Sequence, residues 1–199
     1  MACHPGREAL YAASVQTPLP CAQATGCRKL HAMAGLLPAG VPIEQAHVTY
    51  VTYVTNLRGE ARVRAPHGIM LLIKPINTSN MPGYFLNFQQ QAHEFLTWVG
   101  KPFFKVQMDF YHCQVTEGVL ARRLQRHIAG VGHIQIAGVP DRHEPDVGEG
   151  AHPCLFDRLD ALGYDGWIGC EYIPVGSTSA GLGWLREYQH RGAQVAARP

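Results

Sequence analysis

The chain has 199 residues, of which 46% are hydrophobic and 16% charged, a composition typical of a globular domain with a sizeable core. Lys and Arg number 17 against 15 Asp and Glu, with no run of basic residues interleaved with aromatic ones, which excludes a typical nucleic-acid-binding protein. No apolar run approaches the ~20 residues of a membrane span, and the N-terminus lacks the apolar segment of a signal peptide.

The first part of the chain is hard to assign. Residues 1–25 mix Pro, Gly, Cys and Ala without a clear period, which predicts a poorly defined N-terminal segment that could include a helix within 8–24. A helix is also expected over 44–64, although the tetrapeptide VTYV is repeated at its start, in 48–55. Because β-branched and aromatic residues are poor helix formers, an extra strand there is the alternative.

The remaining pattern alternates between strands and helices. We predict a turn, a strand and a Gly-terminated loop within 26–35, and further strands at 69–73, 105–109, 131–137 and 165–171. Further helices are predicted at 89–99, 117–128, 154–162 and 181–190. Five strand–helix units in succession require a parallel sheet. Since a closed (β/α) barrel uses eight strands, either the sheet is open and smaller or the sequence lacks the first part of a barrel.

Three predicted strands carry an oxygen-bearing side chain near their carboxyl ends: Asp109, Gln135 and Glu171. In a parallel sheet these ends meet at one face, so the three side chains are expected to converge. An all-oxygen set suits Mg²⁺ or Mn²⁺ better than zinc. Glu171 could also serve as the base that removes a proton next to a metal-polarised carbonyl, giving an enediolate.

Two further residues are candidates for binding an anionic or hydroxylated ligand. His112 lies three residues beyond Asp109, and Arg142 lies in the loop DRHEP. Ordinary structural roles remain open for these positions, because an acid at a strand end often caps a helix and an arginine often anchors a loop. Gln135 fits the alternation of any strand.

The cysteines point to a reducing environment. The six of them form no CxxC or other metal-ligand spacing. We therefore expect a cytoplasmic protein, while a bridge between Cys21 and Cys27 stays open.

Four segments carry a resemblance to a known family, namely LLIKPINT, VQMDFYHCQ, GHIQIAGVPDRHEPDVGEG and LFDRLDALGYDGWIGCEYIPVGSTSAGLGWL. Together they resemble the hydroxypyruvate isomerase family, within the xylose-isomerase-like TIM barrels. The resemblance implies an α/β fold, a partial (β/α) barrel that comprises about strands four to eight of eight. It divides the chain into the segment 1–25, a barrel portion over 26–190 and a tail over 191–199.

The resemblance also implies a chemistry. Members interconvert hydroxypyruvate and tartronate semialdehyde with the help of a divalent metal. Carried over to this chain, the metal ligands are Asp109, Gln135 and Glu171, and Glu171 is also a proton-transfer group. The family has a second catalytic glutamate, in LLIEPINT, at the end of the fifth strand. This chain has Lys74 there.

Lys74 changes the expected chemistry. An ammonium in place of a carboxylate alters the formal charge by two units and puts a cation where the metal would bind. At ~4 Å the repulsion is ~4 kcal/mol for an effective dielectric constant of ~20, enough to cut metal affinity by orders of magnitude. Lys74 could instead act as a base, or its ammonium could stand in for the metal.

We therefore expect a hydroxypyruvate isomerase-like protein whose activity is impaired by Lys74 and whose Mg²⁺ or Mn²⁺ could be lost. Two alternatives remain open: a non-catalytic protein that binds a sugar acid or a partner, and an isomerase of another small keto-acid such as a 2-oxo-tetronate. The expected ligand is a small hydroxy- or keto-acid. An open sheet edge would favour a homo-oligomer.

Overall fold

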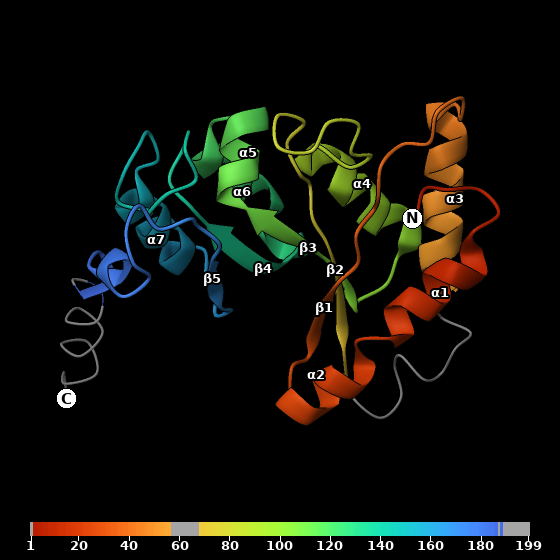
Figure 1. Ribbon diagram of the computed structural model, residues 1–199, viewed down its shortest axis with the longest axis horizontal. Coiled ribbons are helices and arrows are strands. Elements are labelled where there is room, and N and C mark those ends of the chain that lie inside the picture. The colour runs from red at the N-terminus through yellow and green to blue at the C-terminus, as the bar shows by residue number, and fades with distance from the viewer. Residues whose placement is uncertain (1, 57–67, 187, 189–199) are drawn as a thin grey trace.

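A single parallel sheet forms the centre of the molecule. The computed structural model describes residues 2–56, 68–186 and 188. The sheet has five strands in the order of the sequence. They are β1 (Lys29–His31), β2 (Met70–Ile73), β3 (Phe104–Asp109), β4 (Val131–Ile136) and β5 (Ile168–Cys170). The sheet curls like part of a barrel wall, with α4 (Gln89–Val99), α5 (Phe110–Thr116) and α6 (Leu120–His127) along one side of the strands (Figure 1). The predicted partial (β/α) barrel is confirmed.

The helices form an outer layer that follows this curve. They are α1 (Glu8–Gln16), α2 (Leu19–Thr25), α3 (Ile43–Asn56), α4 (Gln89–Val99), α5 (Phe110–Thr116), α6 (Leu120–His127) and α7 (His152–Ala161), with the 3₁₀ turns η1 (Ile128–Gly130) and η2 (Ala180–Leu182). Contacts link α1 to α3, α3 to α4, α4 to α6 and α6 to α7. None of the helices in the described ranges is both long and apolar enough to cross a bilayer.

The repeated VTYV segment is helical. It lies inside α3, so the alternative of an extra strand is wrong. The reason is burial, because Ala46, Tyr50, Tyr53 and Val54 recur at helical spacing and all are buried in the core. Packing of this apolar face outweighs the low helix propensity of the β-branched residues. The predicted remainder of this helix, 57–64, lies outside the described residues.

The ends of the chain differ in how much the structure describes. The helix expected within 8–24 is present as two helices, α1 and α2, whose buried residues belong to the same core cluster as β2 and α3. At the other end, 181–186 and 188 of the predicted helix 181–190 are described. The predicted start is wrong, because the 3₁₀ turn η2 (Ala180–Leu182) and a further turn precede the first helical residue, Leu185. The tail 191–199 lies outside the described residues. Cys21 and Cys27 are free thiols.

The core packs the sheet against the helices that cover it. Tyr50 of α3, Phe95 of α4 and Phe85 pack with ring centroids 4.6 to 5.8 Å apart. A second cluster joins Met108 of β3 and Ile134 of β4 to α6 and α7. Because these side chains are fully or almost fully buried, the neighbouring strand ends form a rigid platform for polar groups.

Candidate functional site

The strand ends bring the predicted oxygen-bearing side chains together. Asp109 ends β3 and pairs in register with Gln135 of β4, which in turn pairs with Gly169 of β5. Paired residues of neighbouring parallel strands point to the same face, and Glu171 lies two residues beyond Gly169, on that face again. Lys74 follows directly after β2.

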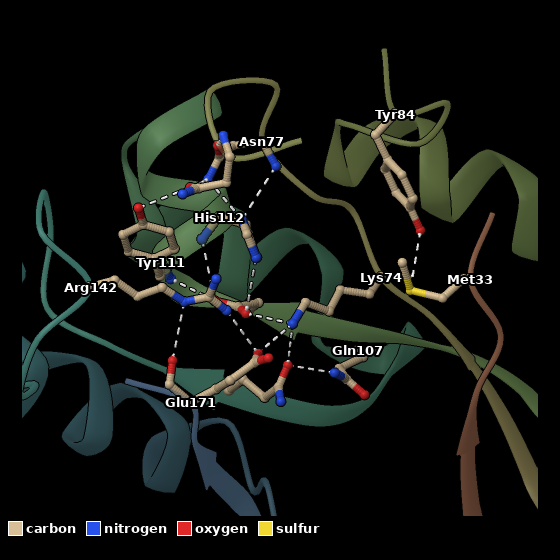
Figure 2. A network of polar contacts seen from close by, with 12 residues as sticks. Met33, Lys74, Asn77, Tyr84, Gln107, Tyr111, His112, Arg142 and Glu171 are labelled. Carbon is tan, nitrogen blue, oxygen red and sulfur yellow. Dashed lines mark hydrogen bonds and ion pairs between the residues drawn. The ribbon is translucent and has the colours of Figure 1, made fainter. Parts of the chain in front are cut away.

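Lys74 lies at the centre of this group. Its Nζ is 2.9 Å from Asp109 Oδ2, 2.7 Å from Gln135 Oε1 and 2.5 Å from Glu171 Oε2. Gln135 Oε1 and Glu171 Oε2 accept hydrogen bonds from this ammonium, and Asp109 Oδ2 lies beside it as an ion-pair partner. The Lys74 residue is only 4% exposed, so water contributes little to its solvation. Figure 2 shows the Lys74 side chain reaching toward Glu171, with Gln107 beside it.

Asp109 has a second role as the N-cap of α5. Its Oδ1 accepts hydrogen bonds from the backbone N–H groups of Tyr111 (2.9 Å) and His112 (3.3 Å). Burial alone would raise the pKa of the Asp109 carboxyl, but the Lys74 ammonium, the His112 ring and the hydrogen bond from the His112 backbone N–H lower it below its usual value. Asp109 therefore does both things that the sequence allowed: it caps α5, and it lies beside the other oxygen-bearing side chains at the site.

Glu171 is the acid that a ligand can reach. Its side chain is 46% exposed, against 1% for Asp109. Arg142 Nη2 is 3.2 Å from Glu171 Oε2, and Arg142 Nε donates to the Glu171 carbonyl at 3.3 Å. The guanidinium lies 5.1 Å from the centre of the Tyr111 ring. Arg142 therefore both anchors its loop to Glu171 and lines the site (Figure 2).

His112 is buried at the start of α5 and is 3% exposed. Burial lowers the pKa of His112 to about 4, so the ring is neutral at neutral pH. Its Nδ1 is 2.7 Å from Asn77 Nδ2, and its Nε2 is 3.7 Å from Asp109 Oδ2. Sequence reasoning did not single out Asn77. Asn77 was visible only as part of LLIKPINT, and the two residues are 35 positions apart.

The comparisons with known proteins agree with this fold. A family model described as a xylose isomerase-like TIM barrel matches residues 3–188. The chain belongs to the xylose isomerase-like TIM-barrel family. It is 51% identical over 191 residues to a 2-oxo-tetronate isomerase of Cupriavidus necator, covering 96% of this chain and 72% of that one. It is 39% identical over 189 residues to the hydroxypyruvate isomerase of Escherichia coli, covering 95% and 72%.

A solved structure shows the same arrangement. The crystal structure described as an AP endonuclease, family 2, from Brucella melitensis superposes with a TM-score of 0.88 at 42% identity. The match covers 94% of this chain and 71% of the other one. This chain therefore spans about 70% of the length of these relatives.

Xylose isomerase-like proteins are typically metal-dependent, yet the residues here do not fit a divalent cation. The ammonium of Lys74 holds the place between Asp109, Gln135 and Glu171 that a metal would need. Lys74 and Arg142 also cancel the charges of the two carboxylates, so a divalent cation would meet no excess negative charge. Within the described ranges, no group of three or more His, Cys, Asp or Glu side chains is arranged to hold a metal ion.

Proposed function

We propose that this chain binds a small hydroxy- or keto-acid at the strand ends and that Lys74 impairs the metal-assisted isomerisation of such an acid. The relatives named hydroxypyruvate isomerase and 2-oxo-tetronate isomerase support the ligand class. The position of Lys74 Nζ, within 2.9 Å of all three oxygens, carries the second part of the proposal.

The geometry supports binding more strongly than catalysis. Arg142 offers a cation for a ligand carboxylate, and the exposed Glu171 lies next to it. Isomerisation would require Glu171 to take a proton from the hydroxyl-bearing carbon beside the ligand carbonyl and return it to the former carbonyl carbon, while a second proton passes from the hydroxyl oxygen to the carbonyl oxygen. Its Oε2 is already paired with both Lys74 and Arg142. Two cations thus hold one oxygen of this carboxylate, and Glu171 would have to release them or take the proton on Oε1.

Ligand binding without metal is the first expected result. Hydroxypyruvate titrated into the chain by calorimetry should bind equally well with and without EDTA. Replacing Arg142 with methionine should weaken binding about tenfold or more, because a charge-assisted hydrogen bond is lost. The matched control is Arg158→Met on the exposed surface of α7, which should bind as the wild type does.

Turnover followed by proton NMR tests the second part. We expect slow or undetectable isomerisation of hydroxypyruvate by the wild-type chain, with no increase on adding Mn²⁺. A rate that rises by orders of magnitude with Mn²⁺ would show that Lys74 moves out of the way and would refute the proposed impairment. Absence of hydroxypyruvate binding would refute the ligand class.

A further inference from the structure

We propose that Asn77 is a positioning residue that fixes the tautomer of His112, so that His112 presents an N–H donor, and not a lone pair, at Nε2. The tautomer follows from hydrogen bonds alone. What the donor does for a ligand rests on the proposed function.

The argument begins with the orientation of the Asn77 amide. The backbone N–H of Asn80 donates to Asn77 Oδ1 at 2.8 Å. A backbone N–H can only donate, so the atom that it meets must be the carbonyl oxygen of the amide. The nitrogen of Asn77 then faces the other way, where it donates to Asn80 Oδ1 at 2.8 Å and lies 2.7 Å from His112 Nδ1.

Two donors therefore converge on one nitrogen of His112. One donor is the side-chain amide of Asn77, and the other is the backbone N–H of Asn77, which donates to the same Nδ1 at 3.3 Å. A neutral imidazole carries its proton on one ring nitrogen only, and a nitrogen that receives hydrogen bonds must offer its lone pair. The proton of the neutral His112 ring therefore lies on Nε2. Asn77 is 1% exposed, so water does not compete for these contacts.

The Nε2–H bond is directed toward the charged centre of the site. Nε2 lies 3.7 Å from Asp109 Oδ2, the oxygen that pairs with Lys74. This separation is too long for a hydrogen bond, so the donor is not used up by Asp109. A ligand oxygen that enters beside Asp109 would meet an N–H group.

This tautomer restricts what His112 can do. A general base needs a free lone pair, and the only one on the neutral ring is occupied by Asn77. A neutral imidazole N–H can instead polarise a carbonyl without carrying charge. Since Lys74 already holds the oxygens that would otherwise bind a metal, His112 is placed to supply that polarisation to a bound keto-acid.

Nitrogen-15 NMR of the full chain, labelled at histidine, tests the tautomer directly. The His112 signals are assigned as those lost in His112→Gln. In the wild type we expect Nε2 with the chemical shift of a protonated ring nitrogen and Nδ1 with that of an unprotonated one. In Asn77→Asp, an almost isosteric change, a carboxylate oxygen replaces the amide donor and should draw a proton onto Nδ1.

Asn80→Ala is the matched control. It removes the side chain of Asn80 but keeps the backbone N–H that orients Asn77, so the His112 tautomer should not change. A protonated Nδ1 in the neutral wild-type ring, or an unprotonated Nδ1 in Asn77→Asp, would overturn the inference. The assigned wild-type spectrum decides the matter even where Asn77→Asp or Asn80→Ala fails to fold.

Binding of glycerate separates the two proposals. Asn77→Asp should weaken glycerate binding about tenfold, the effect of one hydrogen bond, while Asn80→Ala should retain it within a few-fold. The expected tautomer together with no glycerate binding to the wild type would refute the ligand class and leave the tautomer standing. Equal binding by Asn77→Asp and wild type would refute the role of the donor.

Discussion

Replacing Lys74 with glutamate is expected to create a divalent-metal site. The variant would place a third carboxylate beside Asp109 and Glu171, with Gln135 as a fourth oxygen ligand. Removing a repulsion of ~4 kcal/mol at ~4 Å corresponds to a gain in Mn²⁺ affinity of about a thousandfold. Calorimetric titration with Mn²⁺ measures this gain. The isomerisation rate of hydroxypyruvate should rise in the same sample.

A thermal readout checks the same variant without relying on turnover. Three carboxylates at one place repel one another, so Lys74→Glu should melt below the wild type without metal and rise with Mn²⁺, whereas the wild-type melting temperature should not move. Lys105→Glu is the control, because it makes the same charge change at a lysine whose Nζ donates to the Ala129 carbonyl. If Mn²⁺ acts equally on both variants, our account of Lys74 is wrong.

Lys74→Met is expected to lower the free energy of unfolding by about 3 kcal/mol at neutral pH, because removing one member of a buried ion pair leaves the other charge uncompensated. Asp109 accounts for most of this loss. It is 1% exposed, while Glu171 can turn its half-exposed side chain to water. Urea denaturation of the two proteins measures the difference, with Lys105→Met as the control.

The pH dependence of the free energy of unfolding tests whether Asp109 causes the loss of stability in Lys74→Met. In the wild type the pKa of Asp109 lies below its unfolded value of ~3.9, so this carboxylate stabilises the fold above that pH and loses the effect as the pH falls through the folded pKa. In Lys74→Met, burial dominates and the folded pKa rises above ~3.9. The variant should then lose stability as the pH increases, and the gap to the wild type should widen from acid to neutral pH. A constant gap would contradict this assignment.

The strands were predictable because their signal is local. Apolar runs such as Ile69–Ile73 have only one good place in a parallel sheet, between layers that bury both faces. Helix α5 was not predicted, since it has only seven residues, FYHCQVT, with few strong helix formers. It begins where it does because the Asp109 side chain caps its first turn. The sequence allowed helix capping as one of several roles for Asp109, but it gave no reason to prefer that role over the others.

The candidate site was likewise only partly predictable from the sequence. The positions of Asp109, Gln135 and Glu171 at strand ends made their convergence predictable, and Lys74 stood out against the family pattern. Whether the ammonium would turn away or lie between the oxygens depends on the Lys74 side-chain conformation, which no sequence pattern encodes. The contact between Asn77 and His112 joins residues 35 positions apart, one after β2 and one at the start of α5, and depends on the pairing of β2 with β3.

The balance of charge at the site also bears on how fast a ligand arrives. Lys74 and Arg142 offset Asp109 and Glu171, so these four groups together project little field beyond a Debye length of about 8 Å. An enzyme that steers an anion electrostatically gains on-rate and loses it steeply as salt is added. A carboxylate ligand should instead reach this site by unassisted diffusion, at a rate almost independent of ionic strength.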